Sequence, residues 1–173
     1  MKITQTYFVV FIIAFLFNEK SECYAQHSFD VSAGIGDIEL INAGLRYQLS
    51  NRIQIGIKGG TFPSNSENSI SISGNAYYHF AGYSKLSDQP PWYTRIGINY
   101  LKGENEKLLE KYLFLDLRIG RDINITEKIG IKLDGGIVIQ MKKTYVHKVS
   151  TGWNFNFDIP VIPGLGIELF YRI

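Results

Sequence analysis

The chain has 173 residues, a length typical of one domain, and its 18 Lys+Arg against 16 Asp+Glu give a formal net charge of +2. This near-neutral balance offers no electrostatic argument for nucleic-acid binding. A single cysteine excludes an intrachain disulfide framework and a cysteine-based zinc site, and no apolar run is long enough for a membrane-spanning helix. The 11 Tyr, 11 Phe and 17 Gly beside only 5 Pro favour ordered β-structure over a linker or disordered tail.

The first segment has the pattern of a secretory signal. Lys2 precedes an apolar run of 11 residues, Tyr7 to Phe17, and small residues flank Tyr24 as in a signal-peptidase site. We expect cleavage after Ala25, so that residues 1–25 form the signal peptide and residues 26–173 the folded domain. An uncleaved anchor and a lipid anchor on Cys23 are the alternatives.

From residue 29 onward, apolar and polar residues alternate with the period of a β-strand. Eight such segments can be distinguished, and most are about 9–12 residues long, nearer to a tilted membrane-spanning strand than to an ordinary one. The segments are Phe29–Gly36, Ile41–Leu49, Ile53–Lys58, Ile70–Phe80, Trp92–Tyr100, Leu113–Gly120, Ile129–Lys142 and Leu165–Ile173. The segment Glu104–Lys111 is too short for more than one helical turn in a loop.

The two faces of these strands predict which side meets lipid. One face is almost uniformly Ile, Leu, Val and Ala, with Tyr or Trp near the strand ends, as in the aromatic girdles of membrane barrels. The other combines glycine with charges of both signs, which suits the crowded interior of a small closed barrel. The sequence therefore predicts an all-β protein, an eight-stranded antiparallel up-and-down transmembrane β-barrel. A soluble secreted or periplasmic β-barrel or sandwich that binds an apolar ligand is the alternative.

The connections predict how the barrel is oriented. With eight strands both chain ends lie on one side, which export makes the periplasmic side. The turns Ser50–Arg52 and Thr126–Lys128 on that side are short, whereas three connections on the other side are longer, as expected for such barrels. Those longer connections are Pro63–Ser69, Lys102–Tyr112 and Lys143–Gly164. The long inner turn Ala81–Pro91 and a very short outer turn around Asp37 depart from this rule.

The C-terminal segment GLGIELFYRI carries a resemblance to a known family. The segment IPVIPG precedes a stretch in which apolar residues occupy every second position back from the end. These residues are Leu165, Ile167, Leu169, Tyr171 and Ile173. In this the chain resembles the small outer-membrane β-barrel proteins of the OmpA/OmpX type, although the family usually ends in Phe rather than Ile. The resemblance implies location in the outer membrane of a Gram-negative bacterium. It also implies that the barrel-assembly machinery reads this last strand.

Charged residues of the polar face are expected to meet inside the barrel as a hydrogen-bonded plug. They are Arg46, Lys58, Arg95, Asp116, Arg118, Lys132, Asp134, Glu168 and Arg172, and the arginines among them are expected to meet Asp30 as well. A narrow polar path for very small solutes is an alternative reading. Some barrels of this size modify lipid A, but the histidines offer only His147 near Ser150 in a loop, with no acidic partner. We therefore expect no enzyme, no catalytic residue, no metal site and no organic cofactor.

The last outer loop holds the residues with most capacity for recognition. They are Lys143, Tyr145, His147, Lys148 and Trp153. A protruding strand pair is the simpler interpretation, and a contact surface for lipopolysaccharide phosphates or a partner is the functional one. The sequence thus predicts a monomeric structural or surface-interaction protein whose partners are outer-membrane lipid, lipopolysaccharide and the assembly machinery.

Overall fold

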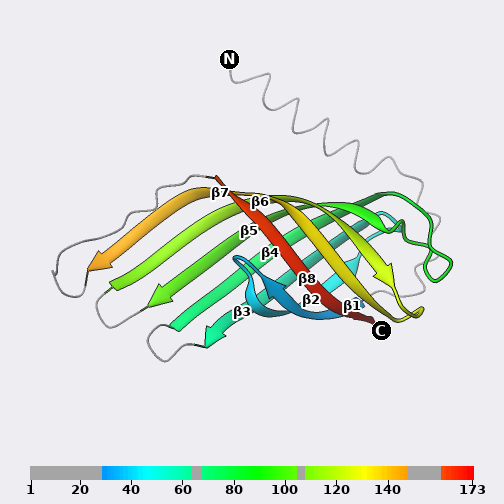
Figure 1. Cartoon of the computed structure of the whole chain (residues 1–173), viewed down its shortest axis with the longest axis horizontal. Coiled ribbons are helices and arrows are strands. Elements are labelled where there is room, and N and C mark those ends of the chain that lie inside the picture. Colours follow the sequence, from blue (N-terminus) through cyan, green and yellow to red (C-terminus); the bar gives the residue numbers. More distant parts are fainter. Residues whose placement is uncertain (1–28, 64–67, 105–107, 148–160) are drawn as a thin grey trace, which may run out of the picture.

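The computed structural model describes residues 29–63, 68–104, 108–147 and 161–173. They form eight β-strands (Figure 1): β1 Phe29–Gly36, β2 Leu40–Gln48, β3 Ile53–Pro63, β4 Asn68–Ala81, β5 Trp92–Glu104, β6 Leu108–Asn124, β7 Ile129–His147 and β8 Val161–Arg172. The described residues contain no helix that is long and apolar enough to cross a membrane. The predicted signal peptide, residues 1–25, lies outside the described residues.

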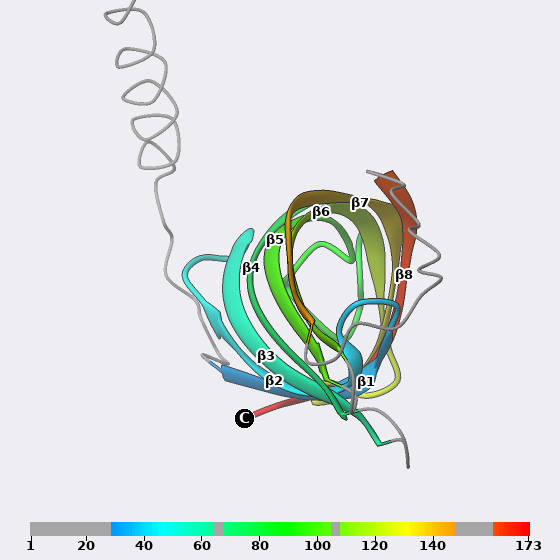
Figure 2. The same ribbon diagram turned by 90° about the vertical axis from the view of Figure 1, so that its left-hand side faces the viewer.

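The eight strands close into one antiparallel barrel. Each strand pairs with its neighbour in the sequence, and β1 pairs with β8 to complete the ring, which Figure 2 shows almost end-on. We call the end that carries Phe29 and Ile173 the proximal end and the opposite end the distal end. The predicted eight-stranded, up-and-down antiparallel barrel is confirmed.

The apolar face of every strand points outward. Ile57 is 64% exposed and Ile98 56%, whereas the inward-facing Asp116 and Lys132 are both 0% exposed. Exposed aromatic side chains, including those of Tyr47, Tyr78, Phe80, Trp92 and Tyr171, lie near the proximal end of the strands. This is the reverse of a water-soluble barrel, in which the aliphatic face packs inside.

Strands β3 to β8 all extend further toward the distal end than the sequence pattern predicted, among them the neighbours β5, β6 and β7. β5 continues to Glu104, β6 begins at Leu108 and β7 continues to His147, so residues 102–104 and 108–112 of the predicted loop Lys102–Tyr112 and parts of Lys143–Gly164 are strand. In Figure 1 these strands reach far to the left of the β1–β2 hairpin. The predicted bounds were too short because they followed the alternation of apolar and polar residues, which stops where the aliphatic face stops. The strands continue beyond that point because their backbone hydrogen bonds do not depend on apolar side chains.

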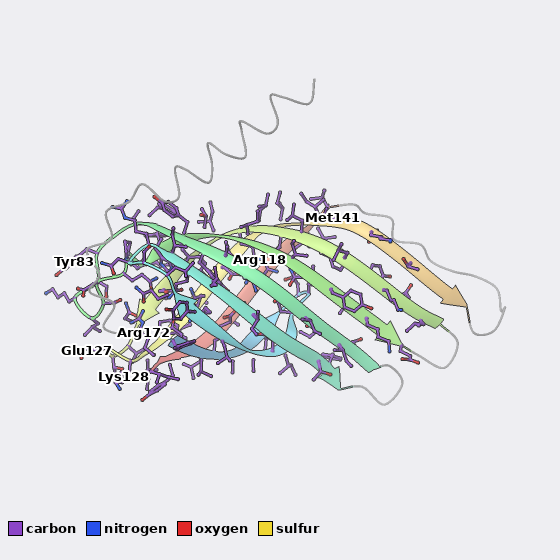
Figure 3. All side chains as sticks on the ribbon, turned by 180° about the vertical axis from the view of Figure 1, so that it is seen from behind. Tyr83, Arg118, Glu127, Lys128, Met141 and Arg172 are labelled. Carbon is purple, nitrogen blue, oxygen red and sulfur yellow. The ribbon has the colours of Figure 1, made fainter. Side chains whose placement is uncertain are left out.

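A β-bulge changes the face that β7 presents. Leu113 pairs with Lys142 and the next residue, Phe114, pairs with Gln140, so Met141 is an extra residue in the ladder. Figure 3 shows Met141 toward the distal end, away from the proximal Tyr83 and Lys128. Beyond the bulge the alternation is shifted by one, and Lys142 is on the outer face.

The β1–β2 hairpin is much shorter than its neighbours. At its distal end β1 stops at Gly36, which pairs with Leu40 on β2 and with Gly166 on β8. β8 itself begins at Val161, five residues before Gly166. The distal segment of β8 is therefore paired only with β7, and Pro163 is tolerated there because an edge strand needs no N–H donor on its free side. The short hairpin leaves its turn, residues 37–39, level with the barrel interior.

Candidate functional site: the barrel interior

The inner face of the barrel is polar and almost free of solvent contact. All nine charged residues that the sequence assigned to the interior are at most 7% exposed: Arg46, Lys58, Arg95, Asp116, Arg118, Lys132, Asp134, Glu168 and Arg172. Glycines alternate with them because the space is narrow. A Cβ added at Gly97, for example, would lie 2.4 Å from the carboxylate of Asp116. Long side chains from different strands therefore come close together across the narrow interior.

Two neighbouring arginines form the centre of this network. Arg95 on β5 and Arg118 on β6 are directly paired in the sheet, and Figure 3 shows Arg118 midway along the barrel. Arg95 contacts Asp116 at 3.0 Å and Asp134 at 3.2 Å, and Arg118 contacts Asp134 at 3.1 Å. Two guanidinium groups this close are tolerated in a buried site because shared carboxylates neutralise them.

The third carboxylate of this centre comes from the β1–β2 turn. Glu39 Oε1 lies 2.5 Å from Arg95 Nη2, and Oε2 lies 2.9 Å from Arg118 Nη2. The side chain thus bridges β5 and β6 from the other side of the barrel. Asp37 adds a contact to Arg118 Nη2 at 2.9 Å.

The backbone of the same turn is also fixed inside the barrel. Ser71 Oγ on β4 donates to the Glu39 carbonyl at 2.9 Å, and Ile38 is buried against Phe114 and Val138. The closest approach is to Gly60, where an added Cβ would be 1.9 Å from the Glu39 carbonyl oxygen. We call residues 37–39 the inserted turn, since they occupy the interior instead of projecting from the barrel.

The charges in the inserted turn respond to opposite influences. Burial acts to raise the pKa of Glu39, but Arg95 and Arg118 outweigh it and hold that pKa below its usual value. Burial raises the pKa of Asp37, because Arg118 compensates only in part. The two arginines that Glu39 contacts therefore favour its ionised form.

A second group of charges lies nearer the proximal end. Lys132 pairs with Asp122 at 2.9 Å, and its ammonium lies 3.8 Å from the centre of the Tyr93 ring, a cation–π contact. Arg46 lies 3.3 Å from Asp30. Between the two groups, Lys58 and Glu168 form an ion pair across the interior.

The connection between β4 and β5 covers the proximal opening. Gln89 in this connection is 5% exposed and accepts a hydrogen bond from Gln54 Nε2 at 3.3 Å. His79 is fully buried beneath it, with Nδ1 2.7 Å from the carbonyl oxygen of Pro90. The long inner turn Ala81–Pro91 thus packs over the proximal end of the interior through Gln89 and Pro90.

The remaining predicted sites have mixed outcomes. The C-terminal apolar residues lie on the outer face: Leu165 69%, Ile167 51%, Leu169 55%, Tyr171 46% and Ile173 62% exposed. Lys143 lies at the distal end, 5.3 Å from the centre of the Tyr112 ring. Lys148 and Trp153 lie outside the described residues, as do the side chains of Tyr145 and His147.

Sequence reasoning missed three of the carboxylates that meet these cations. The expected set, with Asp30, contained six cations but only four carboxylates, and a buried excess of positive charge is costly. That imbalance was the available signal that more acids had to enter the interior. The structure places Asp30 against Arg46 as expected and adds Asp37, Glu39 and Asp122.

The interior contains no metal-binding arrangement within the described residues. No group of three or more His, Cys, Asp or Glu side chains in this part of the chain is placed to hold a metal ion. The carboxylates that do come together, such as Asp116 and Asp134, instead face the guanidinium of Arg95.

Comparison with known proteins gives structural matches alone. No protein-family model matches the chain, and no curated protein matches it significantly. The N-terminal β-barrel domain of Pseudomonas aeruginosa OprF is similar at 12% sequence identity and a TM-score of 0.53, covering 85% of this chain and 98% of that domain. Acinetobacter baumannii CarO is similar at 11% identity and a TM-score of 0.55, with the same coverage of both chains. Both are eight-stranded outer-membrane barrels, so this chain shares their fold.

Proposed function

We propose that the protein is a small outer-membrane barrel with a closed interior, which serves a structural or surface-interaction role. The observation that carries this proposal is the orientation of the faces: exposed aliphatic side chains surround a ring whose backbone groups are paired by neighbouring strands. Such a surface is unfavourable in water and favourable in hydrocarbon, where closed barrels leave no strand edge unpaired. The outer-membrane barrels that share the fold support this location.

Export and assembly follow from the same proposal. The predicted signal, cleaved after Ala25, would direct the chain across the inner membrane. The outward apolar residues of β8, from Leu165 to Ile173, would then present the assembly signal to the barrel-assembly machinery. Lipid and lipopolysaccharide are the proposed surroundings of the inserted barrel, and the barrel is proposed to be a monomer.

A closed interior is supported by the inserted turn and the ion pairs. Glu39 connects the β1–β2 hairpin to β5 and β6, and Lys58 connects β3 to β8. These contacts join elements that are not neighbours in the ring, so they brace the barrel and block passage along its axis. We propose rigidity rather than solute transport as their role.

Two measurements test the proposal. The folded barrel should migrate differently on SDS gels with and without heating and should fractionate with outer membranes. In planar bilayers the purified protein should show no large stable conductance. Migration that does not depend on heating, combined with solubility without detergent, would exclude a membrane barrel, and stable nanosiemens-scale openings would exclude a closed interior.

The alternatives have less support. A soluble barrel with an apolar ligand cavity requires aliphatic side chains inside, yet the interior holds ion pairs and the isoleucines are exposed. A lipid A-modifying enzyme requires a nucleophile, a base and an orienting group in contact. His79, which is buried at the proximal end beside Pro90 and Gln54, is not paired with a nucleophile from the described part of the chain.

A further inference from the structure

The outer face of the barrel changes from aliphatic to basic at the distal ends of three adjacent strands. On β5 the outward residues from Trp92 to Tyr100 lie within a stretch of nine residues, the length that a tilted strand needs to cross hydrocarbon. The next outward residue is Lys102. On β6 Lys111 follows the outward-facing Leu113, and on β7 the bulge brings Lys142 opposite Leu113.

These three lysines are neighbours on one surface. Lys102 and Lys111 are directly opposed across β5 and β6. Lys142 is directly opposed to Leu113, which places it diagonally beside Lys111. Directly opposed side chains have Cβ atoms about 5 Å apart and diagonal ones about 7–8 Å, so long lysine side chains can converge on one ligand.

The lysines are incompletely neutralised by the protein. Lys102 pairs with Glu104 at 2.8 Å, and both side chains are 37% exposed. Lys111 and Lys142 are exposed and form no ion pair within the described residues. Like charges directly opposed across two strands are destabilising, so an anion beside Lys102 and Lys111 would relieve repulsion that the described side chains leave in place.

Basic residues at the proximal end differ in their surroundings. Arg121 lies 5.4 Å from the centre of the Trp92 ring, and Lys128 lies 5.9 Å from that of Tyr171. Each of these cations rests on its own aromatic side chain. Lys102, Lys111 and Lys142 have no such contact among the described residues, and they lie on adjacent strands.

We propose that Lys102, Lys111 and Lys142 form a binding site for the phosphate groups of lipid in the outer leaflet, with the acyl chains against the aliphatic residues below. This inference rests on the proposed membrane location. Its occupant is a phosphorylated lipid rather than a soluble anion, because the site adjoins the exposed aliphatic face through Tyr100 and Leu113. A phosphate there would lie at the level where hydrocarbon gives way to headgroups.

The test compares lipid binding by three purified, detergent-solubilised proteins using native mass spectrometry. The probes are bisphosphorylated lipid A and its dephosphorylated counterpart. The distal variant is Lys102→Gln/Lys111→Gln/Lys142→Gln. The control variant, Lys85→Gln/Arg121→Gln/Lys128→Gln, removes the same charge at the proximal end, where Lys85 lies in the connection between β4 and β5.

The wild type and the control should retain phosphorylated lipid A more strongly than the dephosphorylated lipid. A lysine beside an anionic lipid surface contributes about a fivefold gain in affinity. Loss of Lys111 and Lys142 therefore predicts a drop of about 25-fold, and Lys102 adds less because Glu104 already neutralises it. Replacing the three lysines with arginine should preserve binding.

Equal affinity of the distal and control variants would overturn the proposal, as would equal binding of the two lipids by the wild type. Displacement of lipid A by inorganic phosphate at matched concentration would show a site for free phosphate instead. Heat-modifiable migration and insertion into phosphatidylcholine vesicles are measured for all proteins. If the proteins insert into vesicles but do not prefer phosphorylated lipid A, only the proposed phosphate site is refuted. If the wild type does not insert, the proposed membrane location is refuted as well.

Discussion

Replacing Glu39 with glutamine tests whether the inserted turn holds the barrel together. Glu39 is 2% exposed and receives hydrogen bonds from Arg95 at 2.5 Å and from Arg118 at 2.9 Å. Glutamine has nearly the same shape, but it carries no charge and directs an NH₂ group at one of the two guanidinium groups. The substitution therefore removes the electrostatic contact and creates a donor–donor conflict without leaving a cavity.

The expected cost follows from these two contacts. A hydrogen bond to a charged group contributes about 1.5–3 kcal/mol, and breaking a buried ion pair costs about 3–5 kcal/mol. Arg95 and Arg118 keep their contacts to Asp116 and Asp134, so the lower part of this range applies. We expect Glu39→Gln to lower the free energy of unfolding by about 3 kcal/mol.

Urea titration of the protein in lipid vesicles, followed by tryptophan fluorescence, measures this change. Trp92 on the outer face near the proximal end is one reporter. Glu104→Gln is the matched control, because its ion pair with Lys102 is 37% exposed and such surface pairs contribute about 0–1 kcal/mol. If Glu39→Gln and Glu104→Gln unfold at the same urea concentration as the wild type, the inserted turn is not a stabilising element.

Three further predictions address the turn, the lipid-facing surface and pH. Gly60→Ala should destabilise the barrel by about 1–3 kcal/mol, because the new Cβ meets the Glu39 carbonyl at 1.9 Å; Gly59→Ala, with no atom within 4 Å, should be neutral in the same titration. Ile96→Arg should cost about 2–4 kcal/mol in vesicles and Tyr100→Arg only about 0–1 kcal/mol, and equal values would argue against a hydrocarbon environment. The lowered pKa of Glu39 means that its stabilisation is present above the unfolded-state pKa and is lost as the pH falls through the folded-state pKa. The difference in unfolding free energy between the wild type and Glu39→Gln should therefore shrink in acid, and a constant difference would assign the effect to shape rather than charge.

The sequence by itself determined the strands and their two faces. Alternation with period two identifies a strand and places its residues on opposite sides, so the outward position of Ile98 and the inward position of Arg95 followed from neighbouring residues alone. The number of strands and the two-sided pattern were enough to predict a closed barrel. The cations of the interior were found for the same reason, because they occupy regular positions on strands.

Tertiary structure alone decided which side chains meet inside the barrel. Glu39 lies in a turn, where no period relates a residue to either face, and its partners Arg95 and Arg118 are 56 and 79 residues away in sequence. Lys58 and Glu168 are 110 residues apart and meet only because the ring closes between β1 and β8. The bulge at Met141 likewise depends on the pairing of β7 with β6. Local periodicity fixes the direction of a side chain, whereas its partner across the barrel depends on the register of every strand between them.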